Sequence, residues 1–279
     1  MRVRQWVERE WQHLGLLATI LAPLSLLFRI AVALRRFGYR LGVFPVYRAP
    51  CPVIVVGNLT VGGSGKTPLV IWLANWLREQ GYRPGIVARG YGGRARHWPQ
   101  QVRADSDPGT VGDEAVVLAR RTGAPVCVGP ARGAATAALL AHTDCDVVIS
   151  DDGLQHYALA RDVEVAVVNG ETRFGNGLML PAGPLREPRS RLRRVDMVVS
   201  NGDPLPGSYA MRLRKPILVH LHRDQERREI DMLHGKRVCA IAGIANPERF
   251  FHMLRRYGLE VEGVAFPDHH PYRRDELAF

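Results

Sequence analysis

The stretch that decides the fold is Thr60-Val61-Gly62-Gly63-Ser64-Gly65-Lys66-Thr67, between an apolar β-branched run at residues 53–56 and an apolar helical segment at 68–77. It matches the phosphate-binding pattern G-x-x-x-x-G-K-[ST] except that Thr60 replaces the first glycine. Glycines let backbone N–H groups turn onto phosphate oxygens, and the helix N-terminus adds partial positive charge. Lys66 reaches the β and γ phosphates, and the Thr67 hydroxyl suits Mg²⁺. We predict that residues 60–67 bind a nucleoside triphosphate; a glycine-rich turn that binds nothing is the alternative.

Two carboxylates follow another apolar run, in Asp146-Val147-Val148-Ile149-Ser150-Asp151-Asp152. A P-loop needs an acidic residue at the end of a neighbouring strand to hold its metal, and burying adjacent carboxylates is costly unless a cation shares the site. The sequence therefore predicts Asp151 and Asp152 at the metal, with exposed loop aspartates as the alternative. Gln155 and His156 keep polar groups near the same strand end, where α/β sheets bind ligands.

Short apolar runs alternate with helical segments along most of the chain of 279 residues. Such strands indicate an α/β fold with a mainly parallel sheet of the P-loop NTPase type, covered by helices on both faces. We assign the nucleotide-binding domain to residues 41–170. A Gly/Pro/Arg-rich stretch at 171–194 is expected to form a linker or active-site loop. Residues 195–279 are expected to form a second, smaller α/β domain that is cut short at its C-terminus.

The first 40 residues stand apart from this pattern. No charge occurs from residue 14 to 28, and arginines flank the run at Arg2, Arg4, Arg9, Arg35, Arg36 and Arg40. The run is short of the roughly 20 residues that span a bilayer, and Pro23 is expected to kink it. We predict a membrane-associated helix at residues 1–40 with its arginines toward the headgroups. A buried helix of the soluble core is the alternative.

The formal net charge of +11 implies an anionic partner, which is nucleic acid, an acidic membrane surface or a phosphorylated substrate. The arginines gather near the apolar N-terminus and at residues 186–194, and the sequence holds no nucleic-acid-binding module. We therefore expect no nucleic-acid partner. The four widely spaced cysteines form no C-x-x-C pair, which argues against structural zinc and a disulfide framework.

Features around the P-loop separate a transferase from a nucleotide switch. The guanine-reading sequence N-K-x-D is absent, and Val61 stands where some P-loop ATPases carry an additional lysine. Arg89 and Tyr91 follow a predicted strand and are placed to hold an anionic substrate. Asp113 opens a helix, where it is either an N-cap or a functional carboxylate. A membrane-associated switch that transfers nothing, and a soluble nucleic-acid-binding ATPase, remain as alternatives.

Several motifs, in order over essentially the whole chain, resemble the tetraacyldisaccharide 4′-kinase family of lipid A biosynthesis. They are Val56-Gly57-Asn58-Leu59-Thr60, Arg89-Gly90-Tyr91-Gly92-Gly93, Gly112-Asp113-Glu114, Asp151-Asp152-Gly153-Leu154-Gln155-His156, Leu180-Pro181-Ala182-Gly183-Pro184-Leu185-Arg186-Glu187, Ala242-Gly243-Ile244-Ala245-Asn246-Pro247-Glu248-Arg249-Phe250 and Phe266-Pro267-Asp268-His269-His270. The resemblance implies ATP- and Mg²⁺-dependent transfer of the γ-phosphoryl group to the 4′-hydroxyl of a tetraacylated glucosamine disaccharide 1-phosphate, giving lipid IVA. It also implies two α/β/α domains with the active site between them, an anionic membrane surface as partner, and the cytoplasmic face of the bacterial inner membrane. A monomer is favoured over an oligomer.

The resemblance also assigns roles to matching positions. Lys66 would stabilise the transferring phosphoryl group, and Thr67 would bind Mg²⁺ with Asp152 as the metal-side carboxylate and Asp151 beside it. Asp113 would be the base or orienting group for the sugar hydroxyl, paired with His269 in preference to His270. Arg186 would neutralise charge on the phosphates, with Glu187 near the metal. The expected substrate contacts are Asn58, Arg89, Tyr91, Gln155 and His156.

Overall fold

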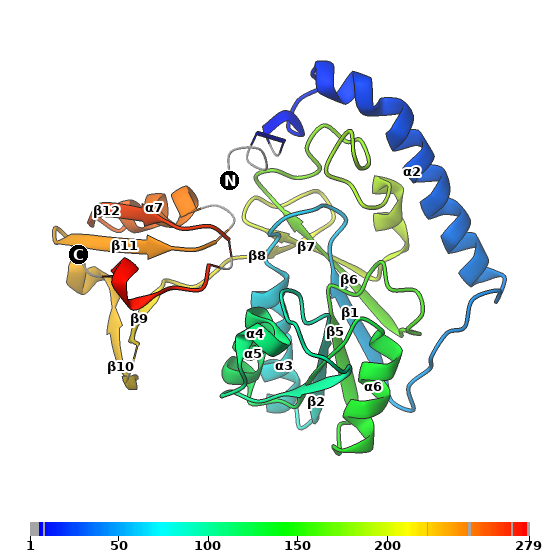
Figure 1. Cartoon of the computed structure of the whole chain (residues 1–279), viewed down its shortest axis with the longest axis horizontal. Coiled ribbons are helices and arrows are strands. Elements are labelled where there is room, and N and C mark those ends of the chain that lie inside the picture. Colours follow the sequence, from blue (N-terminus) through cyan, green and yellow to red (C-terminus); the bar gives the residue numbers. More distant parts are fainter. Residues whose placement is uncertain (1–5, 8, 222, 245–246, 269, 278–279) are drawn as a thin grey trace. The chain divides into compact units, whose positions relative to one another are not determined.

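The computed structural model describes residues 6–7, 9–221, 223–244, 247–268 and 270–277 (Figure 1). The chain divides into a larger unit, Arg2–Met211, and a smaller unit that contains Arg212–Phe279. Each unit has its own hydrophobic core.

The larger unit is built on an eight-stranded sheet in the order β3-β4-β2-β5-β1-β6-β7-β8. All neighbouring strands are parallel except β3 and β4. The strands are β1 (Val53–Gly57), β2 (Pro84–Ala88), β3 (Gln100–Val102), β4 (Val126–Val128), β5 (Val147–Asp151), β6 (Val163–Asn169), β7 (Met197–Asn201) and β8 (Tyr209–Met211). Because parallel strands end at the same edge, the carboxyl ends of β1, β5 and β7 bring their following loops together.

Helices cover both faces of this sheet, as the sequence predicted (Figure 1). They are α2 (Leu16–Arg40), α3 (Lys66–Glu79), α4 (Pro108–Val111), α5 (Asp113–Thr122) and α6 (Arg132–Ala141). The core on one face contains residues of α3 and α5, and the core on the other contains α6 and is contacted by Phe28 and Val32 of α2. Successive residues of the strands point to opposite faces, so the apolar strands fill both cores. The predicted fold class is confirmed.

The boundary between the units differs from the one expected at residues 194 and 195. Strand β7 pairs with β6, and β8 pairs with β7, so both belong to the large sheet. The units divide between Met211 and Arg212. The local sequence of an apolar strand does not indicate which sheet the strand joins. The prediction from the sequence therefore assigned β7 to the wrong unit.

The smaller unit holds two pairs of strands. It contains β9 (Ile217–His220), β10 (Arg223–Glu229), β11 (Arg237–Ala242), α7 (Pro247–Arg256) and β12 (Glu260–Ala265). Strands β9 and β10 are antiparallel, β11 and β12 are parallel, and Phe251 and Leu254 of α7 are buried in the core of this unit.

Three short 3₁₀ helices complete the described elements of the two units: η1 (Arg189–Arg194), η2 (Ile230–Leu233) and η3 (Arg274–Leu277).

Helix α2 runs without a break through Pro23, and only Ala18 and Ser25 in it are buried. It is long and apolar enough to cross a membrane, judged by length and composition alone. Its exposed large apolar side chains are Leu16, Ile20, Leu24, Leu26, Leu27, Ile30, Leu34 and Phe37. The alternative of a helix buried in the soluble core is therefore wrong, because most of its apolar surface faces outward.

Candidate active site

The P-loop joins the end of β1 to α3 through left-handed glycines. Gly62 has φ +100° and Gly65 has φ +92°, which L side chains rarely adopt. Gly65 is the N-cap of α3, and Lys66 is its first helical residue. A Cβ atom at Gly65 would also collide with the side-chain amide of Asn201. The helix N-terminus and the turned backbone form the anion-binding loop that the sequence predicted.

Two amide side chains hold this loop in place, and a third supports one of them. Asn201 Nδ2 donates to the Ser64 carbonyl at 3.2 Å, and Asn58 Nδ2 donates to the Gly62 carbonyl at 3.3 Å. Gln155 Nε2 donates to the Asn58 carbonyl at 3.0 Å. Asn58 is completely buried. Asn58 therefore supports the P-loop through its amide nitrogen, and Gln155 supports Asn58. Contact of Asn58 with a substrate stays a prediction.

Asn201 was missed by the sequence analysis because its strand was assigned to the smaller unit. The residue ends β7, two strands from β1 in the sheet. Because β7 belongs to this sheet, its carboxyl end lies at the same edge as the P-loop, and a residue there can contact the loop.

Asp152 follows β5 and lies between two cations. Its Oδ1 is 3.5 Å from Lys66 Nζ, and Arg186 Nη1 lies 3.2 and 3.0 Å from its two carboxylate oxygens. Burial alone would raise the pKa of Asp152, but Lys66 and Arg186 outweigh burial, so the pKa is lowered. The residue also has φ +48°, a conformation that is uncommon outside glycine. The structure thus brings together the predicted lysine, arginine and carboxylate.

Asp151 has a different environment, although it is the next residue. It is buried, and its Oδ1 has no hydrogen-bond partner within the described part of the chain. Burial, opposed by Lys66 and reinforced by Asp152 and Glu114, raises the pKa of Asp151 to about 7. A buried carboxylate oxygen without a partner is the arrangement expected where a cation shares the site. Asp151 therefore fits a metal better than Asp152, whose charge is already neutralised.

The loop that carries Arg186 is hydrogen-bonded to the start of the P-loop and to the residue before it. Val61 N donates to the Pro184 carbonyl at 2.8 Å, and Arg186 N donates to the Leu59 carbonyl at 2.7 Å. Thr60 and Leu185 form an isolated antiparallel bridge. This short backbone ladder explains how a residue far from the P-loop in sequence reaches Asp152.

Glu187, predicted near the metal, occupies another environment. It is almost fully buried and accepts hydrogen bonds from the Tyr157 hydroxyl and from Gln155 Nε2, the latter at 3.2 Å. Arg36 and Arg191 lie 3.7 and 3.8 Å from its oxygens. Because both oxygens are engaged by protein groups, Glu187 does not fit a metal ligand in this structure, and the predicted role is corrected.

Asp113 begins α5 and Gly112 is the N-cap, so Asp113 is not the N-cap considered above. A Cβ at Gly112, which has φ +92°, would lie 2.5 Å from the Tyr91 carbonyl. The backbone of residues 90–95 also bonds to residues 109–110, through Arg94 N to Gly109 O at 2.9 Å and Ala95 N to Thr110 O at 3.1 Å. The two motifs that the sequence singled out, at residues 89–94 and 112–114, are therefore packed together.

Of the remaining predicted substrate contacts, His156 lies at the N-terminus of α6. Arg89 and Tyr91 are exposed, and His156 is half-buried. Arg132 N donates to His156 Nε2 at 3.2 Å, and buried Arg132 places its Nη2 3.5 Å from the Asp151 carbonyl. Burial, followed by the positive charges of Arg132, Arg161, Arg35 and Arg89, lowers the pKa of His156 to about 4. Arg132 was not predicted, since nothing in its local sequence distinguishes it from other arginines.

The neutral His156 makes stability depend on pH. Its folded pKa lies below the unfolded value near 6.5, so its contribution is present above that value and is lost as the pH falls toward about 4. We expect the melting temperature of the wild type to fall more between about pH 7 and pH 5 than that of His156→Gln, which keeps an acceptor but does not titrate. Equal losses in thermal melts of the two proteins would contradict this account.

His269 lies outside the described residues, and its predicted pairing with Asp113 stays a prediction. Its neighbours Asp268 and His270 belong to the smaller unit. There, His270 Nε2 lies 2.9 Å from Glu276 Oε2.

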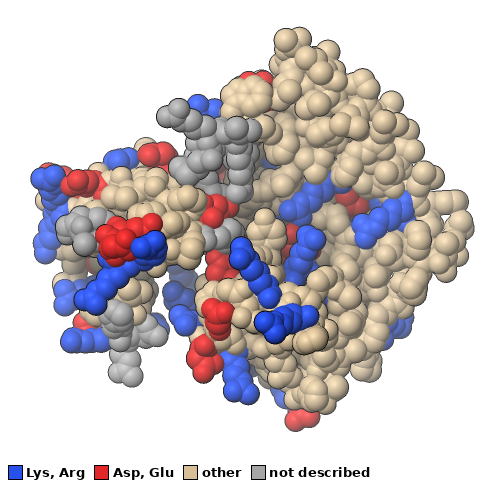
Figure 2. All heavy atoms as spheres, in the orientation of Figure 1, with Lys and Arg blue, Asp and Glu red and all other residues tan. Residues whose placement is uncertain are grey.

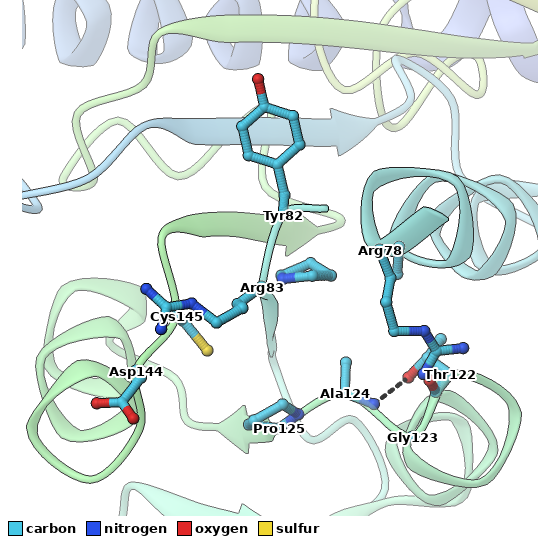
Figure 3. A pocket seen from close by; sticks show the side chains of 11 residues that line it. Arg78, Tyr82, Arg83, Thr122, Gly123, Ala124, Pro125, Asp144 and Cys145 are labelled. Carbon is cyan, nitrogen blue, oxygen red and sulfur yellow. Dashed lines mark hydrogen bonds between the residues drawn. The ribbon is translucent and has the colours of Figure 1, made fainter. Parts of the chain in front are cut away.

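A pocket of about 260 Å³ lies away from this chemistry (Figure 3). It adjoins Pro84, the first residue of β2, and Cys145, just before β5, at the amino ends of these strands. Its lining is mostly apolar, and the Arg83 side chain there contacts Asp146 at 3.4 Å. The P-loop follows the opposite ends of the strands, so this pocket is not part of the nucleotide site.

Comparison with known proteins adds four findings. The family model described as tetraacyldisaccharide-1-P 4′-kinase matches residues 17–279. Tetraacyldisaccharide 4′-kinase of Nitrosococcus oceani is 56% identical over 260 residues, covering 93% of this chain and 77% of that protein. The enzyme of the same name from Methylobacillus flagellatus is 52% identical over 278 residues, covering 99% and 82%. The crystal structure of the "apo" form of LpxK from Aquifex aeolicus in complex with ATP has a TM-score of 0.78 and 29% identity, covering 93% of this chain and 84% of that one.

Proposed function

The chain belongs to the tetraacyldisaccharide-1-P 4′-kinase family, and we propose how its residues divide the work of that reaction. The chain is an ATP-dependent kinase of lipid A synthesis, which transfers the γ-phosphoryl group to the 4′-hydroxyl of the tetraacylated disaccharide 1-phosphate. The observation that carries the division of roles is the cluster of Lys66, Asp152 and Arg186 beside the P-loop. Transfer of label from ATP to this lipid tests the activity itself.

Lys66 and Arg186 neutralise the charge of the γ-phosphoryl group during transfer. Both contact Asp152 within 3.5 Å, so the carboxylate holds the two cations next to the loop before nucleotide binds. Phosphoryl transfer depends chiefly on positioning and charge neutralisation, and preorganised cations provide both. Asp152 thus acts as an anchor for the cations in this proposal.

The Thr67 hydroxyl and Asp151 would hold Mg²⁺. The buried, unpartnered Oδ1 of Asp151 is the observation that supports this assignment. Within the described ranges, no cluster of three or more His, Cys, Asp or Glu side chains forms a metal site by itself. This agrees with P-loop sites, where the protein supplies one or two ligands and the phosphates supply others. When bound, the ion would neutralise charge on the β and γ phosphates.

The metal assignment predicts unequal effects for two carboxylates. Asp151→Asn is expected to raise the Mg²⁺ concentration for half-maximal activity by about 10-fold or more, because a charged ligand becomes neutral. Glu187→Gln is expected to shift this midpoint by less than about 2-fold, because Glu187 is occupied by protein groups. Activity measured against Mg²⁺ concentration at saturating ATP checks both. A comparable shift in Glu187→Gln would return that residue to the metal site.

Asp113 would accept the proton of the 4′-hydroxyl or orient this group. A sugar hydroxyl is a weak nucleophile, so a carboxylate within hydrogen-bond reach assists its attack. The half-buried Asp113 stands in the first turn of α5, and the next residue, Glu114, lies close enough to raise the pKa of Asp151. The N-terminus of α5 is therefore near the phosphate site.

We also propose that α2 lies on the cytoplasmic face of the bacterial inner membrane and that its arginines meet anionic headgroups. In Figure 2 the region of α2 is largely uncharged, with basic side chains beside it. The last turns of the helix carry the exposed Arg35 and Arg40. An exposed apolar face next to basic residues is typical of binding to anionic membranes. In this proposal the acylated substrate is reached in such a surface.

Exposed aliphatic side chains of α2 provide a test of this surface. The triple substitution Ile20→Ser, Leu24→Ser and Leu27→Ser is expected to weaken binding to anionic phospholipid vesicles by about 100-fold, since each buried aliphatic side chain contributes roughly 1.5–3 kcal/mol and part of each is already covered. Vesicle co-sedimentation measures the change. Val117→Ser, at an exposed apolar residue of α5, is the control. Unchanged binding of the triple variant would contradict membrane docking through α2.

A further inference from the structure

Glu187 is the centre of a buried polar network that reaches α2. Its carboxylate accepts hydrogen bonds from Tyr157 and Gln155 and lies beside the guanidinium groups of Arg36 and Arg191. Only 1% of Glu187 is exposed. A carboxylate this deeply buried is costly unless its partners stay in place, so the position of Glu187 depends on them.

The charges of this network are balanced by arginines from three segments. Arg191 Nη2 also donates to Glu164, which Arg161 contacts at 3.1 Å. Burial, followed by the charge of Glu187, raises the pKa of Tyr157 to about 12, so its hydroxyl remains a donor. Among these residues Glu187 has two cationic neighbours, Arg36 from α2 and Arg191. Removal of Arg36 would leave Arg191 as the remaining one.

Helix α2 meets the network through its last turns. The Arg36 guanidinium lies 5.8 Å from the centre of the Tyr157 ring, and the Tyr39 and Tyr157 rings are also 5.8 Å apart. Closer to the N-terminus of the helix, Ser25 Oγ donates to the Met179 carbonyl at 2.7 Å. Helix α2 therefore contacts both ends of the segment that runs from Met179 to Glu187.

The same segment carries Arg186, the residue before Glu187. The backbone of Arg186 is bonded to Leu59, and its side chain contacts Asp152. Gln155 connects the network to the P-loop a second time, because its Nε2 contacts both Glu187 and the carbonyl of Asn58. A displacement of Glu187 would thus shift the backbone that positions the Arg186 side chain.

We propose that Arg36 is a positioning residue for phosphoryl transfer, which acts through Glu187 on the placement of Arg186. The outer helix α2 therefore has a second task besides its apolar contact with lipid: it fixes one of the two cations beside the P-loop. This inference rests on the proposed function of Arg186. Displacements of about 1 Å at a catalytic group can cost up to about 100-fold in rate.

A double-mutant cycle on the full chain tests the path from Arg36 to Arg186. Arg36→Gln is expected to lower kcat for lipid phosphorylation by about 10-fold and to change the KM for ATP by less than about 3-fold. Arg36→Lys is expected to recover part of the loss. In an Arg186→Ala background, Arg36→Gln is expected to lower kcat by less than about 2-fold, because the residue it positions is gone. Arg121→Gln, an exposed arginine in the last turn of α5, is the control with the same change of charge.

Thermal melts accompany each variant, so that a loss of folded protein is separated from a loss of positioning. The inference is overturned if Arg36→Gln leaves kcat unchanged, if its loss is equally large in the Arg186→Ala background, or if the loss follows only the folded fraction. The proposed role of Arg186 fails separately, and takes the inference with it, if Arg186→Ala alone retains full kcat.

Discussion

Lys66→Met is expected to lower kcat for lipid phosphorylation by about 10³-fold, the largest effect of any single substitution considered for this chain. Lys66 is the first residue of α3, and its Nζ lies 3.5 Å from Asp152 beside the P-loop. Methionine has a similar length but carries no charge, so the γ-phosphoryl group would lose a cation as its bond to ADP breaks. Single-turnover transfer of labelled phosphate measures the change.

The control for this substitution is Lys236→Met, which removes an exposed lysine of the smaller unit. It is expected to change kcat by less than about 2-fold, as exposed charges contribute little. A Lys66→Met protein that transferred phosphate within about 5-fold of the wild-type rate would contradict the role given to the P-loop lysine.

Asp113→Ala is expected to lower turnover by about 10²-fold or more and to leave nucleotide affinity little changed, because a general base acts on the acceptor hydroxyl and not on ATP. Steady-state transfer to lipid gives the turnover, and titration with a fluorescent ATP analogue gives the affinity. Asp113 also opens α5, where an acidic residue stabilises a helix by roughly 0.3–1 kcal/mol. Thermal melts therefore accompany the kinetics.

Asp105→Ala is the matched control for Asp113→Ala, since Asp105 is an exposed aspartate of the same region of sequence. It is expected to retain wild-type turnover. If nucleotide affinity and turnover fell together in Asp113→Ala, Asp113 would be part of the structure of the nucleotide site and not a base.

Local patterns were sufficient to predict the sheet and the P-loop. The β-branched run before the loop, the glycines at 62, 63 and 65 and the apolar helix after it all lie within a short stretch of chain. The same holds for Asp151 and Asp152, which directly follow an apolar strand. Signals of this kind depend on a few neighbouring residues, and tertiary packing here agrees with them.

The supports of the site could not be predicted, because they join residues that are distant in sequence. Asn201 holds Ser64, and Glu187 is surrounded by Arg36 and Tyr157. The sequence shows that Glu187 is an acidic residue in a motif, and the resemblance suggested a metal. Its partners, which decide its role, come from α2 and from the segment after β5.

Transfer of labelled γ-phosphate from ATP to the tetraacylated disaccharide 1-phosphate tests the central claim most directly. In the presence of Mg²⁺ and lipid, the account predicts label at the 4′ position, with one ADP formed for each lipid phosphorylated. Lys66→Met is expected to slow the formation of both products together by about 10³-fold. Consumption of ATP without labelled lipid would contradict the account and would favour a nucleotide switch at the membrane.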